Sequence, residues 1–285
     1  MRFSWCVCDL DGTLLDGTGA VSRKDQQALR RLAGEGVPLI LATGRTDLMV
    51  ARYALELGVE MPVIACNGGL IRDVRSREVL YVKTMEPALA EGLCRHFLAE
   101  ERDFLIYTLD GVYYAPGSRR VERFERYNAL AEPALRVPLL PVEQWERDRV
   151  AQPAIKFLLA DVSEGWTSEL ERAFNGRGEL TIISSEHGVL DIMASSTSKG
   201  GALEILARAR GLDLKRTIVF GDNYNDLSMF ELCGLPIAMA NAEEAVKRAA
   251  AYVTLSNEAS GVGEAIERLL QGGGRLTSSL EAGEA

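Results

Sequence analysis

The 285-residue chain is poor in histidine, and its cysteines show no metal-binding pattern. It has two histidines, His96 and His187, and no Cys/His spacing typical of a zinc site. A Gly-x-Ser-x-Gly nucleophile turn is also absent. Histidine-based catalysis is therefore disfavoured. We expect His96 to be structural or solvated, whereas His187, in the turn Glu186-His187-Gly188, could contact a substrate.

Five cysteines is an odd number, and their spacing gives no disulfide framework. Cys6 and Cys8 lie two residues apart, on one face if the segment is a strand, so buried free thiols in a reducing compartment are the favoured interpretation. No apolar run approaches membrane-spanning length, and the one that follows Met1 is too short for a signal peptide. We expect a cytoplasmic protein with no membrane partner.

The chain has no surplus of positive charge. With 41 acidic and 32 basic side chains its net charge is -9, which disfavours nucleic acid as a partner because such binding depends on basic surfaces. The apolar share of 47% is ordinary for a globular protein, and the length allows one domain with a sizeable insertion. An acidic protein that acts on an anionic substrate must offset its own charge locally.

Strand and helix patterns alternate in the first part of the chain. Short apolar runs predict buried strands at 3–8, 37–42 and 63–66. Helices are predicted at 22–33 and 47–57, the first capped by Ser22 with Asp25 as the acidic partner. Repeated strand–helix–strand units imply a parallel sheet that is covered on both faces.

The middle of the chain has a different pattern, with a hairpin signal at Asp110-Gly111. The alternating pattern returns after it. We therefore predict an α/β fold with a Rossmann-like parallel-sheet core, residues 1–83 plus 189–285, interrupted by an inserted α+β cap domain, residues 84–188. The tail from Gly272, rich in Gly, Ser and Glu, is predicted to be disordered.

The strongest chemical signal is the string Asp9-Leu10-Asp11-Gly12-Thr13-Leu14, directly after the first predicted strand. Ligands bind at the carboxyl ends of strands in open parallel sheets. Alternation along the strand brings the carboxylates of Asp9 and Asp11 toward the same side, and Gly12 permits a sharp turn. Such a pair suits a hard cation, or a nucleophile with a proton shuttle.

Two further turns follow the next strands. Thr43-Gly44 offers a hydroxyl and backbone N–H groups at a strand-to-helix turn, which is typical of an anion cradle. Asn67-Gly68-Gly69 is either a simple turn or an additional loop close to a phosphate. Lys199 opens a predicted helix in a chain with 26 arginines and only six lysines, and a lysine at that place makes a compact phosphate site.

Another acidic segment, Gly221-Asp222-Asn223-Tyr224-Asn225-Asp226, follows a predicted strand at 217–220. Carboxylates gathered at one edge would repel each other without a cation, so the arrangement predicts a bound divalent metal. Mg²⁺ fits, because it takes oxygen ligands and leaves positions for water and phosphate.

These segments, in this order, resemble the four motifs of the haloacid dehalogenase superfamily of phosphohydrolases. The likeness covers essentially the whole chain. No room for a cap exists between Asp11 and Thr43, whereas the stretch from Thr43 to Lys199 has ample room. A large cap at that place is similar to the Cof-like subgroup, which has a C2-type cap and includes phosphatases of sugar phosphates and other metabolites.

The resemblance implies a role for each matching residue. Asp9 would attack phosphorus and form an aspartyl-phosphate, and Asp11 would act as acid and then as base. Mg²⁺ would be held by the Asp9 carboxylate, the Asp11 main-chain carbonyl and Asp222. Asp226 would support the metal or Lys199 from behind. The groups expected to bind phosphate are Leu10, Thr43, Gly44, Lys199 and Asn225.

The expected activity is hydrolysis of a small phosphorylated metabolite, a phosphoric monoester, with a sugar phosphate as the default substrate. A phosphorylated cofactor, such as flavin mononucleotide or pyridoxal phosphate, is an alternative. Two other functions remain open: a phosphomutase of the same superfamily and a catalytically silent binding or regulatory protein. The first is disfavoured by the place of the cap, and the second by the intact Asp9, Asp11, Lys199 and Asp222. Oligomeric state does not follow from the sequence.

Overall fold

The computed structural model describes residues 2–163, 165–186, 188–274 and 276. His187 and most of the tail predicted to be disordered lie outside the described residues. The chain divides into two compact units: residues 1–43, 54–63 and 199–285 form the first, and residues 44–53 and 64–198 form the second. The predicted boundaries of the inserted cap, 84–188, stay a prediction. None of the helices in the described ranges combines the length and the apolar character needed to cross a membrane.

The first unit is built on a five-stranded sheet in the order β14-β13-β12-β1-β2, and all of its pairings are parallel. This confirms the predicted Rossmann-like core. The third predicted strand, 63–66, is not part of this sheet, because it belongs to a separate three-stranded sheet. The strands are β1 (Trp5–Cys8), β2 (Leu39–Leu41), β12 (Thr217–Gly221), β13 (Leu235–Ala238) and β14 (Tyr252–Val253). Residues of β1, β2 and β12 are almost all buried, as expected for a parallel sheet with covered faces.

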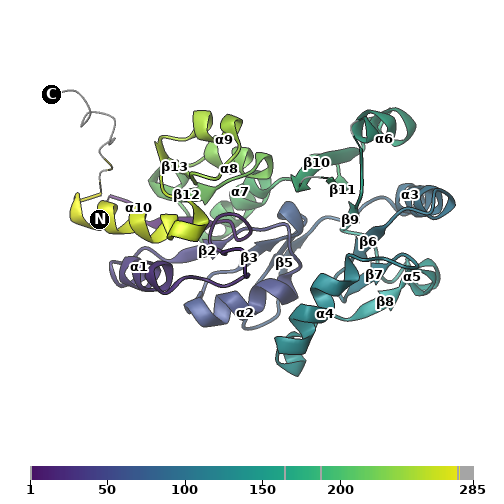
Figure 1. The fold of residues 1–285 in the computed structure, drawn as a ribbon, viewed down its shortest axis with the longest axis horizontal. Coiled ribbons are helices and arrows are strands. Elements are labelled where there is room, and N and C mark those ends of the chain that lie inside the picture. The colour runs from purple at the N-terminus through teal and green to yellow at the C-terminus, as the bar shows by residue number, and fades with distance from the viewer. Residues whose placement is uncertain (1, 164, 187, 275, 277–285) are drawn as a thin grey trace. The chain divides into compact units, whose positions relative to one another are not determined.

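Helices complete the first unit. They are α1 (Arg23–Gly34), α7 (Lys199–Arg210), α8 (Leu227–Phe230), α9 (Glu244–Ala249) and α10 (Gly261–Gln271). Figure 1 shows α1 and α10 side by side, and the ion pair between Lys24 Nζ and Glu264 Oε2, at 3.0 Å, joins them. Ser22 caps α1 as predicted, since its hydroxyl accepts from the Asp25 N–H and donates to the Asp25 carboxylate.

The second unit contains a six-stranded sheet in the order β10-β11-β9-β6-β7-β8 and a three-stranded sheet in the order β3-β4-β5. The strands of the larger sheet are β6 (Phe104–Tyr107), β7 (Val112–Tyr114), β8 (Leu139–Pro141), β9 (Lys156–Leu159), β10 (Leu180–Glu186) and β11 (Val189–Ala194). The smaller sheet has β3 (Val63–Ala65), β4 (Leu70–Arg72) and β5 (Val79–Val82). The larger sheet is mainly antiparallel, in line with the predicted α+β character of this region.

Side chains alternate between two apolar clusters along β6. Phe104 and Ile106 belong to one cluster, and Leu105 and Tyr107 to the other. The first cluster packs against helices α3 (Pro87–Ala99), α5 (Val142–Asp148) and α6 (Trp166–Phe174), and the second against α4 (Val121–Leu130). The remaining helix, α2 (Asp47–Leu57), was predicted with these bounds, and the division between units falls inside it, after Tyr53.

Two details of the second unit differ from the sequence expectation. The hairpin at Asp110-Gly111 has a four-residue loop, because Tyr107 pairs with Val112 and the Thr108 N–H donates to the Gly111 carbonyl. Neither strand β8 nor helix α5 was predicted from the sequence. Strand β8 ends at Pro141 and is an edge strand, where proline is tolerated.

Candidate active site

Strand register in the first unit brings the predicted motifs to one edge of the sheet. Cys8, the last residue of β1, pairs with Phe220 of β12 and with Leu41 of β2. The Asp9 N–H continues this register and donates to the Phe220 carbonyl at 3.2 Å. Asp9, Thr43 and Asp222 therefore follow their strands at the same edge, as the sequence predicted.

Lys199 lies between two carboxylates. Its Nζ is 2.7 Å from Asp9 Oδ1 and 2.7 Å from Asp226 Oδ1, and both are hydrogen-bonded ion pairs. All three side chains are buried, with exposed fractions of 0%, 6% and 0% for Lys199, Asp9 and Asp226. Placement at the first position of α7 orients the lysine, and Gly200 behind it leaves no room for a side chain against the Ser228 backbone. The predicted convergence of Lys199 and Asp9 is therefore present in the structure.

Asp226 has both carboxylate oxygens engaged. One oxygen binds Lys199, and the other accepts the backbone N–H groups of Asp222 at 2.9 Å and Asn223 at 3.1 Å. A Cβ on Gly221 would lie 2.6 Å from the Asp226 Cγ, so only glycine admits this carboxylate. Asp226 therefore fixes the backbone that carries Asp222 and holds Lys199 from behind, in line with the supporting position expected for it.

The loop after β1 holds Asp222 from the other side. Thr13 Oγ1 donates to Asp222 Oδ1 at 2.6 Å. Gly12 has φ +77, and a Cβ there would lie 2.8 Å from the Asp222 Cγ and nearer still to its Oδ2. Asn241 Nδ2 donates to the Gly12 carbonyl at 2.7 Å, which braces the turn. The Asp-Gly turn is thus shaped around a carboxylate 210 positions later in the chain.

Buried negative charge in this cluster exceeds the positive charge beside it. Asp9, Asp222 and Asp226 each place a carboxylate oxygen within 4.8 Å of the others. Burial, with repulsion from Asp226, raises the pKa of Asp222 to about 7. Burial also raises the pKa of Asp9, although Lys199 acts in the opposite direction. Oxygen donors with unbalanced charge fit a hard divalent cation.

Five other residues were predicted for the site: Asp11, Thr43, Leu10, Asn225 and Gly44. Asp11 is partly exposed, and its charge contributes to the raised pKa of Asp222. Thr43 is buried one residue beyond Ala42, whose N–H donates to the Cys8 carbonyl. Leu10 is fully buried, and Asn225 lies in the short helical turn η4 (Tyr224–Asp226). Gly44 is the first residue of the second unit.

His96 is structural, one of the two outcomes predicted for it. Its ring packs against the rings of Phe97, Trp166 and Phe174, with centroids 5.2–6.3 Å apart. The possible contact of His187 with a substrate stays a prediction.

Sequence reasoning assigned no role to Thr13, Asn241 and Ser228. Thr13 lies inside the first motif, and this position in the sequence could have indicated a role in the site. Asn241 lies in an ordinary turn after β13, and nothing in the sequence points to Gly12. Ser228 Oγ accepts the Gly200 N–H at 3.0 Å and thereby braces the start of α7, a contact that no spacing rule predicts.

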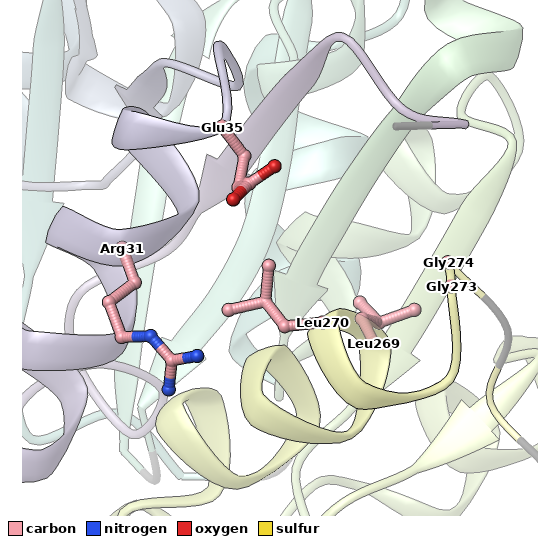
Figure 2. A pocket seen from close by; sticks show the side chains of 6 residues that line it. All are labelled: Arg31, Glu35, Leu269, Leu270, Gly273 and Gly274. Carbon is pink, nitrogen blue, oxygen red and sulfur yellow. The ribbon is translucent and has the colours of Figure 1, made fainter.

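A cavity of about 400 Å³ lies elsewhere in the first unit, beside the end of α10. Figure 2 shows its lining residues: Arg31, Glu35, Leu269, Leu270, Gly273 and Gly274. Arg31 is already ion-paired with Glu267. None of the predicted site residues lines this cavity, so it is separate from the acidic cluster.

Comparison with known proteins assigns most of the chain to one family. The sequence profile of a family described as haloacid dehalogenase-like hydrolase matches residues 6–266. The chain is similar to 5-amino-6-(5-phospho-D-ribitylamino)uracil phosphatase YwtE of Bacillus subtilis, with 28% identity over 94% of this chain and 98% of that protein. Pyridoxal phosphate phosphatase YbhA of Escherichia coli is also 28% identical, over 90% and 95% of the two chains.

A solved structure is similar over almost its whole length. It is a haloacid dehalogenase-like hydrolase from Bacteroides thetaiotaomicron, 27% identical, with a TM-score of 0.79 over 94% of this chain and 99% of that one. The matched family segment contains Asp9, Thr43, Lys199 and Asp222.

Proposed function

The chain belongs to the haloacid dehalogenase-like hydrolases and is a phosphatase of the Cof-like subclass, and on this premise we propose that it hydrolyses a small phosphorylated metabolite with Mg²⁺ through an aspartyl-phosphate on Asp9. The observation that carries the proposal is the buried cluster of Asp9, Asp222, Asp226 and Lys199. We also propose that the protein is cytoplasmic, as expected from its sequence.

In the first step, a carboxylate oxygen of Asp9 attacks phosphorus, and the bond between phosphorus and the leaving oxygen breaks. Asp11 donates a proton to that oxygen, so the leaving group departs as an alcohol. In the second step, Asp11 accepts a proton from water as the water oxygen attacks phosphorus, and the acyl-phosphate bond breaks to regenerate Asp9. The partly exposed position of Asp11 suits a group that exchanges protons with both an alcohol and water.

Lys199 supports both steps electrostatically. It offsets the charge of Asp9 while the carboxylate approaches an anionic phosphoryl group, and Asp226 keeps its ammonium in place. Asp9, Asp222 and the Asp11 carbonyl would hold Mg²⁺, which would neutralise phosphoryl charge in the transition state. Thr43, Gly44, Leu10 and Asn225 would bind the phosphoryl oxygens.

We propose a sugar phosphate as the substrate, on the basis of the resemblance to the Cof-like subgroup. The buried cluster itself does not select the leaving group, because its residues would bind only the phosphoryl group and the metal. The names of YwtE and YbhA give two such groups, a ribitylaminouracil and pyridoxal. Both are phosphoric monoesters of small alcohols, which is the chemistry that the proposal requires.

The proposal is tested by a screen of phosphorylated metabolites with Mg²⁺, read as phosphate release. Asp9→Asn should abolish release, and so should chelation of the metal. Asp25→Asn is the matched control. Asp25 is also a buried carboxylate of the first unit, but its partners are Ser22 and the Gly263 N–H, so release should persist. Release that survives both Asp9→Asn and chelation would contradict the mechanism.

A further inference from the structure

A second buried lysine lies in the second unit, outside the cluster described above. Lys156 of β9 is 2% exposed, and its Nζ is 2.9 Å from Asp191 Oδ1 on β11. The same Nζ donates to the Gly44 carbonyl at 2.8 Å, across 112 positions of the chain. Tyr107 lies beneath the ammonium, with its ring centroid 4.4 Å away. The lysine thus donates a charge-assisted hydrogen bond to one backbone carbonyl of a turn.

Asn67 extends this network. Its Nδ2 donates to Asp191 Oδ2 at 2.7 Å, and the residue is fully buried with φ +54. A Cβ on Gly44 would lie 3.1 Å from Asn67 Oδ1, so the amide packs closely against the Gly44 backbone. The Asn67-Gly68 turn, which the sequence left as either a simple turn or a loop close to a phosphate, therefore supports the turn after β2.

The anchored carbonyl determines where a backbone donor points. The Gly44–Arg45 peptide is trans and planar, so the Arg45 N–H points opposite to the Gly44 carbonyl that Lys156 binds. The Arg45 carbonyl accepts the Cys66 N–H at 2.9 Å. Because the Arg45–Thr46 peptide is also trans, the Thr46 N–H points away from Cys66. Two successive N–H groups at the start of α2 are thereby oriented, and such groups bind anions.

A buried ion pair is an inefficient way to stabilise a fold, because desolvation offsets most of the attraction. The pair of Lys156 and Asp191 does, however, fix the geometry of the Thr43–Gly44 turn, because Lys156 also binds the Gly44 carbonyl. We propose that Lys156, held by Asp191 and Asn67, is a positioning residue that fixes this turn and, through it, the groups that bind the phosphoryl oxygens. This inference rests on the proposed function.

The first test is Lys156→Met, assayed with p-nitrophenyl phosphate and with the best sugar phosphate from the screen. Displacement of a phosphoryl-binding turn should lower kcat/KM on the order of 100-fold. The loss should be the same for both substrates, because they share the phosphoryl group and differ in the leaving group. A loss confined to one substrate would overturn the proposal, since Lys156 would then act on the leaving group; unchanged kinetics would overturn it too.

Two further variants separate positioning from folding. Lys156→Met with Asp191→Asn leaves no unpaired buried charge and should show the same kinetic loss as Lys156→Met. Phe157→Leu is the matched control, because Phe157 is the next residue of β9, is fully buried and points to the opposite face. It should lower the melting temperature and leave kcat/KM within about twofold. An equal kinetic loss in Phe157→Leu would mean that Lys156 matters only for folding.

A double-mutant cycle with Thr43→Val provides the decisive measurement. If Lys156 acts through the turn, Thr43→Val should cost at least about tenfold less in the Lys156→Met background than in the wild type. Additive losses would overturn the inference and leave the proposed function intact, provided that Asp9→Asn remains inactive. A wild type without Mg²⁺-dependent phosphatase activity would overturn both.

Discussion

Each unit of the molecule contains a buried lysine that is paired with aspartate, and the two environments differ in charge. Lys199 in the first unit binds Asp9 and Asp226, with Asp222 close by, so three carboxylates surround one cation. Lys156 in the second unit binds one carboxylate, that of Asp191, and a neutral carbonyl. The first cluster carries unbalanced negative charge and the second is balanced.

This difference separates two uses of the same residue type. An unbalanced buried cluster needs a further cation, which is the mark of a site that binds a metal together with an anionic substrate. A cluster with balanced charge calls for no further cation, which suits a role in fixing geometry. Substitution of either lysine tests this distinction.

The largest effect is expected from Lys199→Met. Loss of a cation that neutralises the attacking carboxylate and the phosphoryl group should lower kcat/KM on the order of 10³-fold or more. This exceeds the loss expected for Lys156→Met, since Lys156 acts only through the turn. Steady-state kinetics of the two variants under the same Mg²⁺ concentration make the comparison, and equal losses would contradict the distinction drawn here.

Mg²⁺ should stabilise the protein through the first cluster alone. A ligand at 100 times its Kd stabilises the native state by about 2.7 kcal/mol, which is visible as a rise in melting temperature. Asp222→Asn should remove most of this rise, whereas Asp191→Asn should preserve it, because Asp191 belongs to the balanced cluster. Calorimetric scans with and without Mg²⁺ measure the difference. A Mg²⁺-dependent rise that survives in Asp222→Asn would place the metal elsewhere.

Much of this arrangement could be predicted from the sequence, because the first cluster is built at strand ends. Asp9, Thr43 and Asp222 each follow an apolar run, and parallel pairing brings such ends to one edge. Lys199 was singled out as one of six lysines, placed at a helix start. The assignment of roles to these residues also depended on the resemblance to the four motifs of the superfamily.

The second cluster could not be predicted in this way. Lys156 is the first residue of β9 and Asp191 lies inside β11, both otherwise apolar strands, and their meeting depends on the pairing of β9 with β11. The contact with Gly44 depends on tertiary packing across 112 positions. Long-range contacts of this kind have no local signature, and the same holds for the bond from Asn241 to Gly12.

The pH dependence of metal binding gives a smaller effect with a defined sign. Burial and Asp226 raise the pKa of Asp222 to about 7, so in the metal-free protein this carboxyl binds a proton that the unfolded chain releases near its ordinary value of 3.8. The metal-free fold should therefore lose stability as pH rises from about 4 through 7. Mg²⁺ displaces the proton, so its affinity should fall up to about tenfold per pH unit below 7.

Isothermal titration between pH 5.5 and 8.5 measures both the affinity and the protons released. Asp191→Asn is again the control and should retain the pH profile of the wild type. An affinity that does not change below pH 7 would mean that Asp222 is ionised before the metal arrives.

The smallest effect is expected from alanine substitution at two glycines with positive φ. Comparison of the two variants separates the cost of backbone strain from the loss of the geometry that binds Mg²⁺. Gly12 and Gly36 both have positive φ, at +77 and +80, so alanine at either position should cost about 1 kcal/mol of stability. A Cβ at Gly36 meets nothing within 4 Å, whereas a Cβ at Gly12 would displace the Asp222 carboxylate. Gly12→Ala should therefore weaken Mg²⁺ binding on the order of tenfold, the lower end of the range for disturbed support of a metal ligand. Gly36→Ala should leave Mg²⁺ affinity unchanged at a similar melting temperature. If the two variants bind Mg²⁺ equally well, the turn after β1 does not shape the unbalanced cluster, and the contrast between the two lysines loses its structural basis.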